Sequence, residues 1–517
     1  MNSVDPPLHQ GHARRWLGLC VICAATFISG VDTTIVNVAL PAIADDLGAT
    51  FSDLQWVIDG FLVILAGTLL IGSGLADRFG RKRIFVISLL AFALTSMLAV
   101  LATNPTQLIL ARVLMGAAAA GLLPTALSLL AVMFAPSERA KAVGIWTAVA
   151  GIGVGFGPLI GSILLELSGW QAVFLINVPV CLAAAVFAIA ILPESRRPGV
   201  PPLDLLGAAA SIVALGGIVF ALIEGGSHGF GQMSVLVALG LGIAATAAFV
   251  ALELRRQFPL FDVRILGRAP VFSGAVALMA CYLSFFGSLL LLPQLLYFVQ
   301  DRSTLVTGLA LCPMGVTLGV LAPLSSHLLA RIGPRATLVI GVCVMMLGTG
   351  VQLLNTADSS IVIVLAGVVI YGAGLAVTIT PATAMIMNEV GVAKAGDGGA
   401  LNQVSRQIGG ALGVALVGST FAVVYRAGFG DDLSGLDSTA RSAITKGIEA
   451  TQQTAAGLAP EIKATLLRDA NHSFELAARA GLGVCIGILI LSALVTLVAL
   501  RPRPLRGSSG AVVDSPG

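Results

Sequence analysis

Charged side chains are scarce in this sequence. Asp, Glu, Lys and Arg make up 11% of the 517 residues, whereas 57% of the residues are hydrophobic. Because a soluble protein carries roughly 25% charged residues, the composition excludes an ordinary soluble domain and indicates an integral membrane protein. The net charge of +3 is no argument for nucleic-acid binding, since the basic residues are spread over short loops.

The residues that hold metals, cofactors or covalent intermediates are also few. There are five His and seven Cys, and every cysteine falls in an apolar segment. Cys20 and Cys23 are spaced like a metal-binding pair, but no second pair or His cluster accompanies them. The sequence contains no Walker motif for ATP and no nucleophile–base pair. It therefore predicts no disulfide, no metal, no cofactor and no enzymatic activity.

Long apolar runs are abundant instead. A membrane-spanning helix needs about 20 mostly apolar residues, and the sequence contains fourteen such runs. They cover residues 17–40, 54–76, 84–102, 108–133, 141–165, 171–192, 204–224, 233–252, 271–297, 307–329, 336–354, 361–386, 399–425 and 475–500. If both termini are cytoplasmic, 20 of the 29 Lys and Arg residues lie on the cytoplasmic side. This positive-inside bias predicts that orientation.

An internal repeat relates two parts of the chain. The segment "SGLADRFGRKRIFVIS" (73–88) follows the second run, and the similar "SHLLARIGPRATLVIG" (326–341) follows the tenth. Two related halves indicate a transporter whose substrate binds between them near the bilayer centre. The predicted order is a cytoplasmic leader (1–16), a six-helix bundle (17–192), two inserted helices (204–252), a second six-helix bundle (271–500) with an outer loop (427–474), and a cytoplasmic tail (501–517).

The turn after the second run is short, basic and rich in glycine. Read by charge alone, it anchors the helix ends on the cytoplasmic side. Its ordered pattern also resembles the loop motif of the major facilitator superfamily, which implies a conformational latch between the halves. The matching residues are Gly74, Asp77, Arg78, Gly80, Arg81 and Lys82.

The fifth run contains glycines four residues apart beside a proline, at Gly153, Gly157, Pro158 and Gly161. Such glycines present a small face that lets another helix approach closely, and this packing role is one interpretation. The pattern also resembles the antiporter motif of the superfamily's drug exporters. That resemblance implies export rather than uptake.

Asp32, Asp59, Arg112 and Arg406 are charged residues inside apolar runs, where charges are costly and usually functional. The segment that begins at Asp32, "DTTIVNVALPAIADDLG", resembles the first-helix motif of the fourteen-helix drug:proton antiporters of the EmrB/QacA type, and "WVIDGFLV" around Asp59 matches their second helix. The resemblance implies proton transfer involving Arg112, for which either acid is a candidate partner. Alternatively, Asp32 bonds Thr33, Thr34 or Asn37, and Arg112 reaches the outer headgroups.

Weaker signals come from other polar and aromatic residues. Glu224 ends the seventh run and either takes part in proton coupling or faces outer water. In the outer loop, helical periodicity predicts short amphipathic helices. Further residues are candidates for lining a central cavity, although packing is the alternative for the aromatic ones. These candidates are Asn37, Asn402, Gln403, Arg406, Tyr282 and Phe286.

Together the patterns predict an all-α, fourteen-helix membrane protein of the major facilitator fold. The predicted activity is proton-coupled export of hydrophobic or cationic toxic compounds or antibiotics across a bacterial cytoplasmic membrane. Its partners would be the small-molecule substrate, protons and the bilayer, and nothing in the sequence demands a periplasmic adaptor. The alternatives are a dedicated exporter of one metabolite, antibiotic or lipid, and a nutrient symporter, against which the Gly-Pro motif argues.

Overall fold

The computed structural model describes residues 14–196, 204–256, 263–390, 395–429, 444, 447–456 and 460–500, and its elements are all helical. In chain order they are α1 (Arg15–Leu47), α2 (Phe51–Phe79), α3 (Arg81–Val100), α4 (Pro105–Met133), α5 (Pro136–Ser168), α6 (Gln171–Leu175), α7 (Asn177–Ile191), α8 (Leu205–His228), α9 (Met233–Arg255), η1 (Val263–Gly267), α10 (Ala269–Gln294), η2 (Leu295–Val299), α11 (Thr304–Gln352), α12 (Ile361–Val390), α13 (Ala395–Ala427), α15 (Ile448–Ala456) and α16 (Pro460–Ala499).

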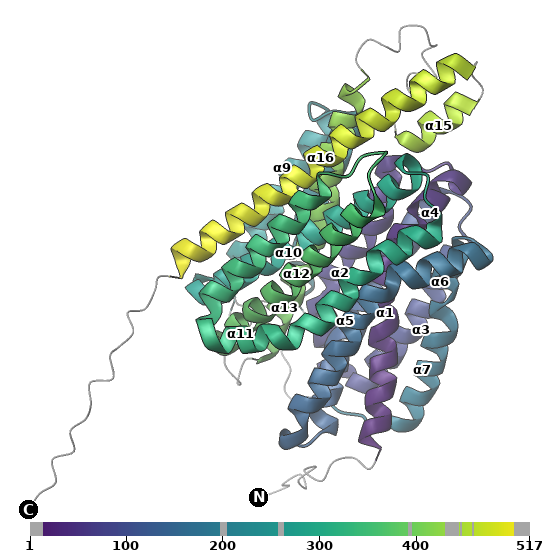
Figure 1. Cartoon of the computed structure of the whole chain (residues 1–517). Coiled ribbons are helices and arrows are strands. Elements are labelled where there is room, and N and C mark those ends of the chain that lie inside the picture. Colours follow the sequence, from purple (N-terminus) through teal and green to yellow (C-terminus); the bar gives the residue numbers. More distant parts are fainter. Residues whose placement is uncertain are drawn as a thin grey trace, which may run out of the picture.

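Fourteen membrane crossings are confirmed. Thirteen helical segments of the described chain are long and apolar enough to cross a bilayer, with α6 and α7 together forming one of them. The longest, α11, has 49 residues and breaks at Gly333, where φ is +78°. It therefore supplies two crossings, before and after this glycine. The helices α1 and α16 begin and end at the same end of the molecule, as an even number of crossings requires (Figure 1).

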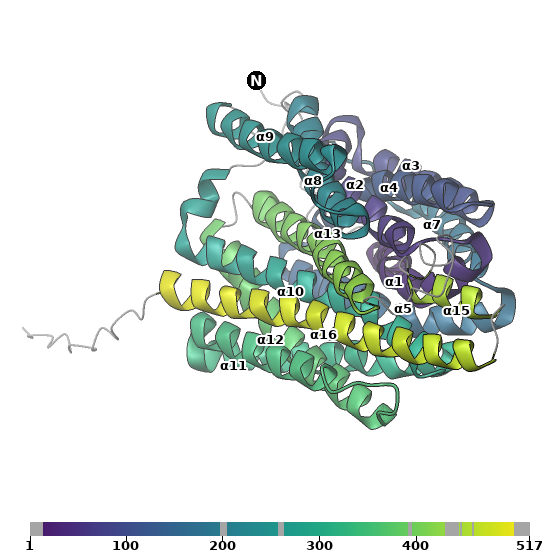
Figure 2. The same cartoon turned by 90° about the horizontal axis from the view of Figure 1, so that it is seen from above.

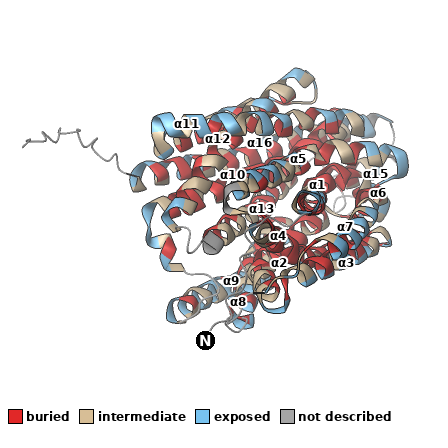
Figure 3. Ribbon diagram, turned by 90° about the horizontal axis from the view of Figure 1, so that it is seen from below, coloured by how far each residue is buried: buried red, intermediate tan, exposed pale blue. Residues whose placement is uncertain are grey.

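The helices form two bundles with an added pair at the side. One bundle contains α1 to α7, and the other contains α10 to α13 with α16 (Figures 1 and 2). Seen from below, buried residues concentrate where α1, α2 and α4 meet, while α9 lies at the edge and is largely exposed (Figure 3). The apolar exposed faces match a chain surrounded by lipid.

The internal repeat appears as matching geometry. Gly80 and Gly333 occupy equivalent repeat positions and both have positive φ, +112° and +78°. Glycine adopts this region at little steric cost, which allows the sharp turn between consecutive helices. Two residues later, the Lys82 Nζ donates to the Ile189 carbonyl at 2.6 Å, and the Arg335 Nη2 donates to the Leu497 carbonyl at 3.0 Å. Each basic residue thus holds the cytoplasmic end of the last helix of its own bundle.

In this conformation the loop motif is bonded within the first bundle. Arg81 Nη2 lies 2.8 Å from the Asp77 Oδ1, one helical turn earlier. The backbone N–H of Lys82 donates to the Glu194 carboxylate at 3.3 Å. These contacts of Asp77, Arg81 and Lys82 all lie within the first bundle. A latch between the two halves therefore remains a prediction.

The two bundles contact each other from the middle of the membrane to its outer surface. The rings of Phe51 and Phe421 are 4.8 Å apart, and the Gln55 Nε2 donates to the Val414 carbonyl at 3.1 Å. Deeper in the membrane, Gly155 of α5 and Gly315 of α11 meet so closely that a Cβ on either would overlap the other's backbone. Toward the end where α1 begins, the bundles diverge (Figure 1). The structure is therefore closed on the outer side.

Helix α8 is attached to both bundles at its outer end. On one side, Ser52 and Trp56 of α2 donate to the Glu224 Oε1 at 3.2 and 3.4 Å. On the other side, the Arg426 Nη2 of α13 donates to the Gly226 carbonyl at 2.8 Å. In the view from above, α8 lies between α2 and α13 (Figure 2). Glu224 thus lies at an outer helix contact, with His228 Nδ1 3.0 Å from its second oxygen.

Part of the predicted outer loop is helical, as its pattern indicates. The last helix, α16, begins at Pro460, within that loop, and continues without a break into the last apolar run. Helix α15 packs over the outer ends of the bundles. There the Tyr425 hydroxyl lies 3.0 Å from the Thr451 Oγ1, and the Gln452 Nε2 donates to the Phe298 carbonyl at 3.3 Å.

Docking of α15 is expected to depend on pH through Glu449. This side chain is 5% exposed, and its Oε1 has no hydrogen-bond partner in the described part of the chain. Burial, with the charge of nearby Asp45, raises the pKa of Glu449 to about 7 from 4.5. The docked helix therefore holds a proton that the undocked helix releases above pH 4.5, so docking weakens by about 3 kcal/mol as pH rises from 4.5 through 7.

Hydrogen–deuterium exchange of residues 448–456 between pH 5 and pH 8, corrected for the chemical exchange rate, measures this effect. Exchange should accelerate with pH in the wild type and stay nearly constant in Glu449→Gln, which retains the shape of the side chain. An equal pH response in both proteins would contradict the assignment to Glu449.

Candidate proton and substrate site

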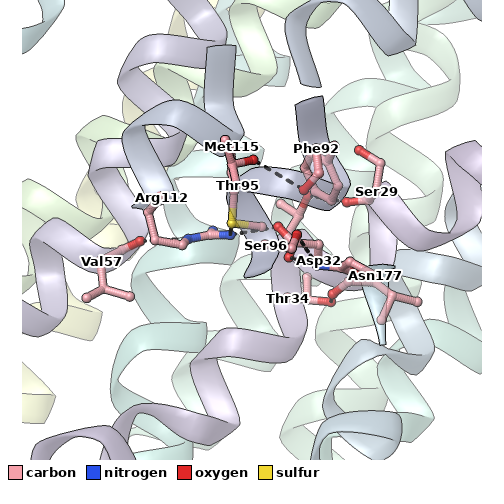
Figure 4. Close-up of polar contacts among 12 residues, drawn as sticks. Ser29, Asp32, Thr34, Val57, Phe92, Thr95, Ser96, Arg112, Met115 and Asn177 are labelled. Carbon is pink, nitrogen blue, oxygen red and sulfur yellow. Dashed lines mark hydrogen bonds and ion pairs between the residues drawn. The ribbon is translucent and has the colours of Figure 1, made fainter. Parts of the chain in front are cut away.

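A buried ion pair joins α1 to α4. The Arg112 Nη1 donates to the Asp32 Oδ2 at 2.7 Å, and the two side chains are only 1% and 0% exposed (Figure 4). The Arg112 Nε also donates to the Val57 carbonyl of α2 at 3.0 Å. Its guanidinium carbon lies 4.3 Å from the centre of the Phe61 ring, in a cation–π contact. Arg112 therefore points into the bundle and not to the outer headgroups.

Small residues let the helices approach closely enough to build this pair. A Cβ at Gly153 would lie 2.6 Å from the Phe27 carbonyl, and one at Gly157 would overlap Thr34, both in α1. Gly161 likewise faces Ile35. The glycines of the predicted antiporter motif thus pack α5 against the helix that carries Asp32, as small residues do in membrane bundles.

Sequence reasoning missed Asn177, the third member of the cluster. Its Nδ2 donates to the Asp32 Oδ1 at 2.8 Å and also lies 3.2 Å from the Ser96 Oγ, so it connects α1, α3 and α7 (Figure 4). The residue is fully buried. An amide inside the apolar run "FLINVP" is the signal that could have identified it. By contrast, Thr33, Thr34 and Asn37 bond backbone carbonyls rather than Asp32.

Both oxygens of the Asp32 carboxylate are hydrogen-bonded by other helices. One accepts from Arg112 and the other from Asn177. Adding a proton to Asp32 would cancel its charge and leave the Arg112 guanidinium buried without a counter-ion. Because removing one partner of a buried pair is costly, protonation would have to be accompanied by a rearrangement of α1 and α4.

Asp59 lies apart from this pair. Helix α2 begins with a capping box in which the Thr50 N–H donates to the Asp53 Oδ2 at 2.8 Å. Asp59 is further along the same helix, is fully buried, and neither of its oxygens has a hydrogen-bond partner in the described residues. Of the two candidate acids, the structure joins Asp32 to Arg112 and leaves Asp59 unpaired.

The cavity candidates divide by exposure. Asn37 and Phe286 are buried, and the Asn402 Nδ2 donates to the Thr383 Oγ1 at 2.7 Å. Tyr282, Gln403 and Arg406 are partly exposed. The Arg406 guanidinium carbon lies 5.1 Å from the centre of the Tyr282 ring, joining α13 to α10. Tyr282, Gln403 and Arg406 thus form the part of the predicted lining that reaches a surface.

Helix α10 shows where that surface lies. Between Val271 and Leu296 its partly or fully exposed residues are Phe272, Val276, Met279 and Tyr282. Their spacing of three or four residues places them on one helix face. From Leu283 onward the helix is buried up to Leu296. The exposed face of α10 therefore runs from its cytoplasmic end as far as Tyr282.

A separate cavity of about 420 Å³ lies in the cytoplasmic half of the second bundle. It is mostly apolar, with His327 and Arg331 as its basic residues, which sequence reasoning did not single out. Its lining residues are Leu321, Leu324, Ser325, His327, Leu328, Arg331 and Val377.

Comparisons with known proteins agree on the family. The Major Facilitator Superfamily model matches residues 22–414. The tetracenomycin C resistance and export protein of Streptomyces glaucescens is 32% identical over 501 residues, covering 95% of this chain and 93% of that protein. The puromycin resistance protein of Streptomyces alboniger is 36% identical over 412 residues, covering 78% and 81%.

The fold has solved counterparts. A bacterial homologue of the human lysosomal transporter Spinster, in an inward-facing and unoccupied conformation, superposes with a TM-score of 0.67 at 16% identity, covering 95% of this chain and 99% of that one. The helix count, the buried Asp32–Arg112 pair and the relatives lead to one assignment. This multi-pass membrane protein belongs to the Major Facilitator Superfamily of transporters, in its fourteen-helix drug:proton antiporter family.

Proposed function

We propose that the protein exports hydrophobic, antibiotic-like compounds in exchange for protons across a bacterial cytoplasmic membrane. The observation that carries the proposal is the fully buried Asp32–Arg112 pair, a carboxylate and a guanidinium that join α1 to α4 inside the membrane. Relatives named for resistance to, or export of, tetracenomycin C and puromycin support the direction of transport.

The proposed cycle alternates access to the two sides. The described conformation is closed outside, where Gln55 of α2 bonds the Val414 carbonyl of α13, and so suits a state that receives substrate from the cytoplasm. After the bundles rock to open outside, Asp32 takes up a proton and its bond to Arg112 is released. The return to the inward-facing state delivers that proton to the cytoplasm, where Arg112 and Asn177 again stabilise the carboxylate.

Asp59 has a supporting role in this scheme. A charged carboxylate without any hydrogen-bond partner is expensive to bury, so the described conformation suits a protonated Asp59. It is therefore a second candidate proton carrier, next to the outer contact made by Gln55. Glu224 is better placed to regulate the outer contact of α8 than to carry the coupled proton.

A dedicated exporter of one self-made antibiotic, metabolite or lipid is the second candidate. It would use the same antiport residues, and the relative named for both resistance to and export of tetracenomycin C favours it specifically. The breadth of substrates separates the two possibilities.

Transport in proteoliposomes tests the proposal. Tetracenomycin C should accumulate in vesicles with an acidic interior, relative to protein-free vesicles, and dissipation of the pH gradient should stop it. Asp32→Asn should reduce gradient-driven accumulation by about 100-fold or more. Asp301→Asn is the matched control, because Asp301 is exposed in an outer turn with φ +51°, a conformation that asparagine also adopts. Full gradient-driven transport by Asp32→Asn would refute the assigned role.

A further inference from the structure

Arg406 is a cation inside the membrane with no anionic partner among the residues that the structure describes. It lies 11 residues after the cytoplasmic start of α13, about 17 Å along the helix, and so near the bilayer centre. Within the described part of the chain its guanidinium makes no ion pair or hydrogen bond, and its Nε is buried with no acceptor. Its described contact is the Tyr282 ring. An unpaired intramembrane charge is expensive and marks a functional site.

The position of Arg406 places it at the inner edge of the contact between the bundles. One turn further out, a Cβ at Gly410 would lie 2.9 Å from Phe286 of α10 and 3.3 Å from Leu62 of α2, so both bundles meet there. Arg406 and Tyr282 are partly exposed just on the cytoplasmic side of this point. They lie where the exposed face of α10 ends, which is where a substrate from the cytoplasm would stop.

The acids do not balance this charge. Asp32 is fully buried and already paired with Arg112, and Asp59 is fully buried in α2. Among the side chains that the structure describes, the charge presented to the inner surface at this depth is therefore positive. Neither of these two acids therefore offers an accessible carboxylate to a cationic substrate in this conformation.

We propose that Arg406 and Tyr282 bind the anionic group of an amphipathic aromatic substrate. A carboxylate or ionised phenol would accept hydrogen bonds from the planar guanidinium. Its ring system would pack against Tyr282, which contacts Phe285 and Phe286 at ring distances of 6.1 and 6.4 Å. Gln403 and Gln407, both partly exposed on the same helix, would add polar contacts. This names the substrate class of the exporter and so rests on the proposed function.

Two dyes with the same xanthene ring system and opposite charge test the proposal. Binding of fluorescein, an anion, and rhodamine 123, a cation, is measured by fluorescence anisotropy on the purified full-length protein at pH 7.5. The wild type should bind fluorescein more tightly. Arg406→Gln should weaken fluorescein binding by about tenfold or more, the usual scale for a hydrogen bond to a charged group, and Arg406→Lys should retain part of it.

Two controls keep the result interpretable. Arg255→Gln makes the same change at the exposed end of α9 and should bind fluorescein as the wild type does. Rhodamine 123 binding that is unchanged or stronger in Arg406→Gln shows that the variant is folded. Preference of the wild type for rhodamine 123, binding of neither dye, or equal fluorescein affinity in Arg406→Gln would each overturn the proposal.

A transport measurement distinguishes failure of this inference from failure of the proposed function. Exchange of one proton for an anion moves at least two charges per cycle, and three for fluorescein, which is mainly a dianion at pH 7.5, whereas exchange for a monovalent cation moves none. An inside-positive membrane potential should therefore speed fluorescein uptake into vesicles and leave rhodamine 123 exchange unaffected. Proton-driven transport of rhodamine 123 alone would refute the anionic class and leave proton-coupled export intact.

Discussion

Replacing Arg112 by methionine should lower the stability of the protein by about 3–5 kcal/mol and abolish proton-coupled transport. The variant leaves the Asp32 carboxylate fully buried, with Asn177 as its one remaining polar partner among the described side chains. Breaking a buried ion pair costs this much because the other charge stays desolvated. Thermal unfolding in detergent at pH 7.5, followed by circular dichroism, measures the loss.

The double variant Asp32→Asn/Arg112→Met separates stability from coupling. Removing both charges should recover most of the stability, since the uncompensated carboxylate is gone. Gradient-driven transport should remain absent, because no titratable group is left at this helix contact. Arg255→Met, at the exposed end of α9, is the matched control and should behave as the wild type. A single Arg112→Met variant as stable as the wild type would show that the pair contributes nothing to folding.

Gly155→Val should reduce transport by about 100-fold while the protein still folds. Any side chain at this position would overlap the backbone of Gly315 across the bundle interface. Helices α5 and α11 then cannot meet, which opposes the described closed-outside conformation but not the packing within each bundle. Gly144→Val is the matched control on the same helix, because its Cβ would meet nothing within 4 Å.

Thiol labelling measures the expected shift away from the closed-outside conformation. In a variant without the seven native cysteines, Ser52→Cys changes one small side chain at the outer end of α2, where the structure buries it. A membrane-impermeant maleimide added outside should label this cysteine faster when Gly155→Val is present. Equal labelling rates with and without the Gly155→Val substitution, together with full transport, would show that the glycine contact is dispensable.

The fold was largely predictable because hydrophobicity sets it. Fourteen apolar runs and the positive-inside bias gave the crossings and the orientation, and the Gly80 repeat gave the two halves. The start of α16 was not predictable in this way. Apolar runs report where a helix enters lipid, whereas α16 continues beyond it through residues of mixed polarity that pack against α15.

Only the charged residues of the site could be predicted from the sequence. Asp32, Asp59 and Arg112 stand out because a charge in an apolar run is costly. Asn177 and Gly155 lack that signal, since their roles depend on which helices meet. The exposure of these charged side chains could likewise not be predicted from the sequence. Only the structure shows that Asp32 and Asp59 are buried while Arg406 is partly exposed.

The attachment of α8 changes how many rigid parts must move. Its outer end is bonded to α2 through Glu224 and to α13 through the Arg426 guanidinium. Two bundles that rock apart on the outside cannot both keep these bonds, so each cycle must break one set and reform it. The inserted pair, α8 and α9, is thus a third moving part that stays attached to one bundle and separates from the other. The bonds that break in this step add to the free-energy barrier for opening outward.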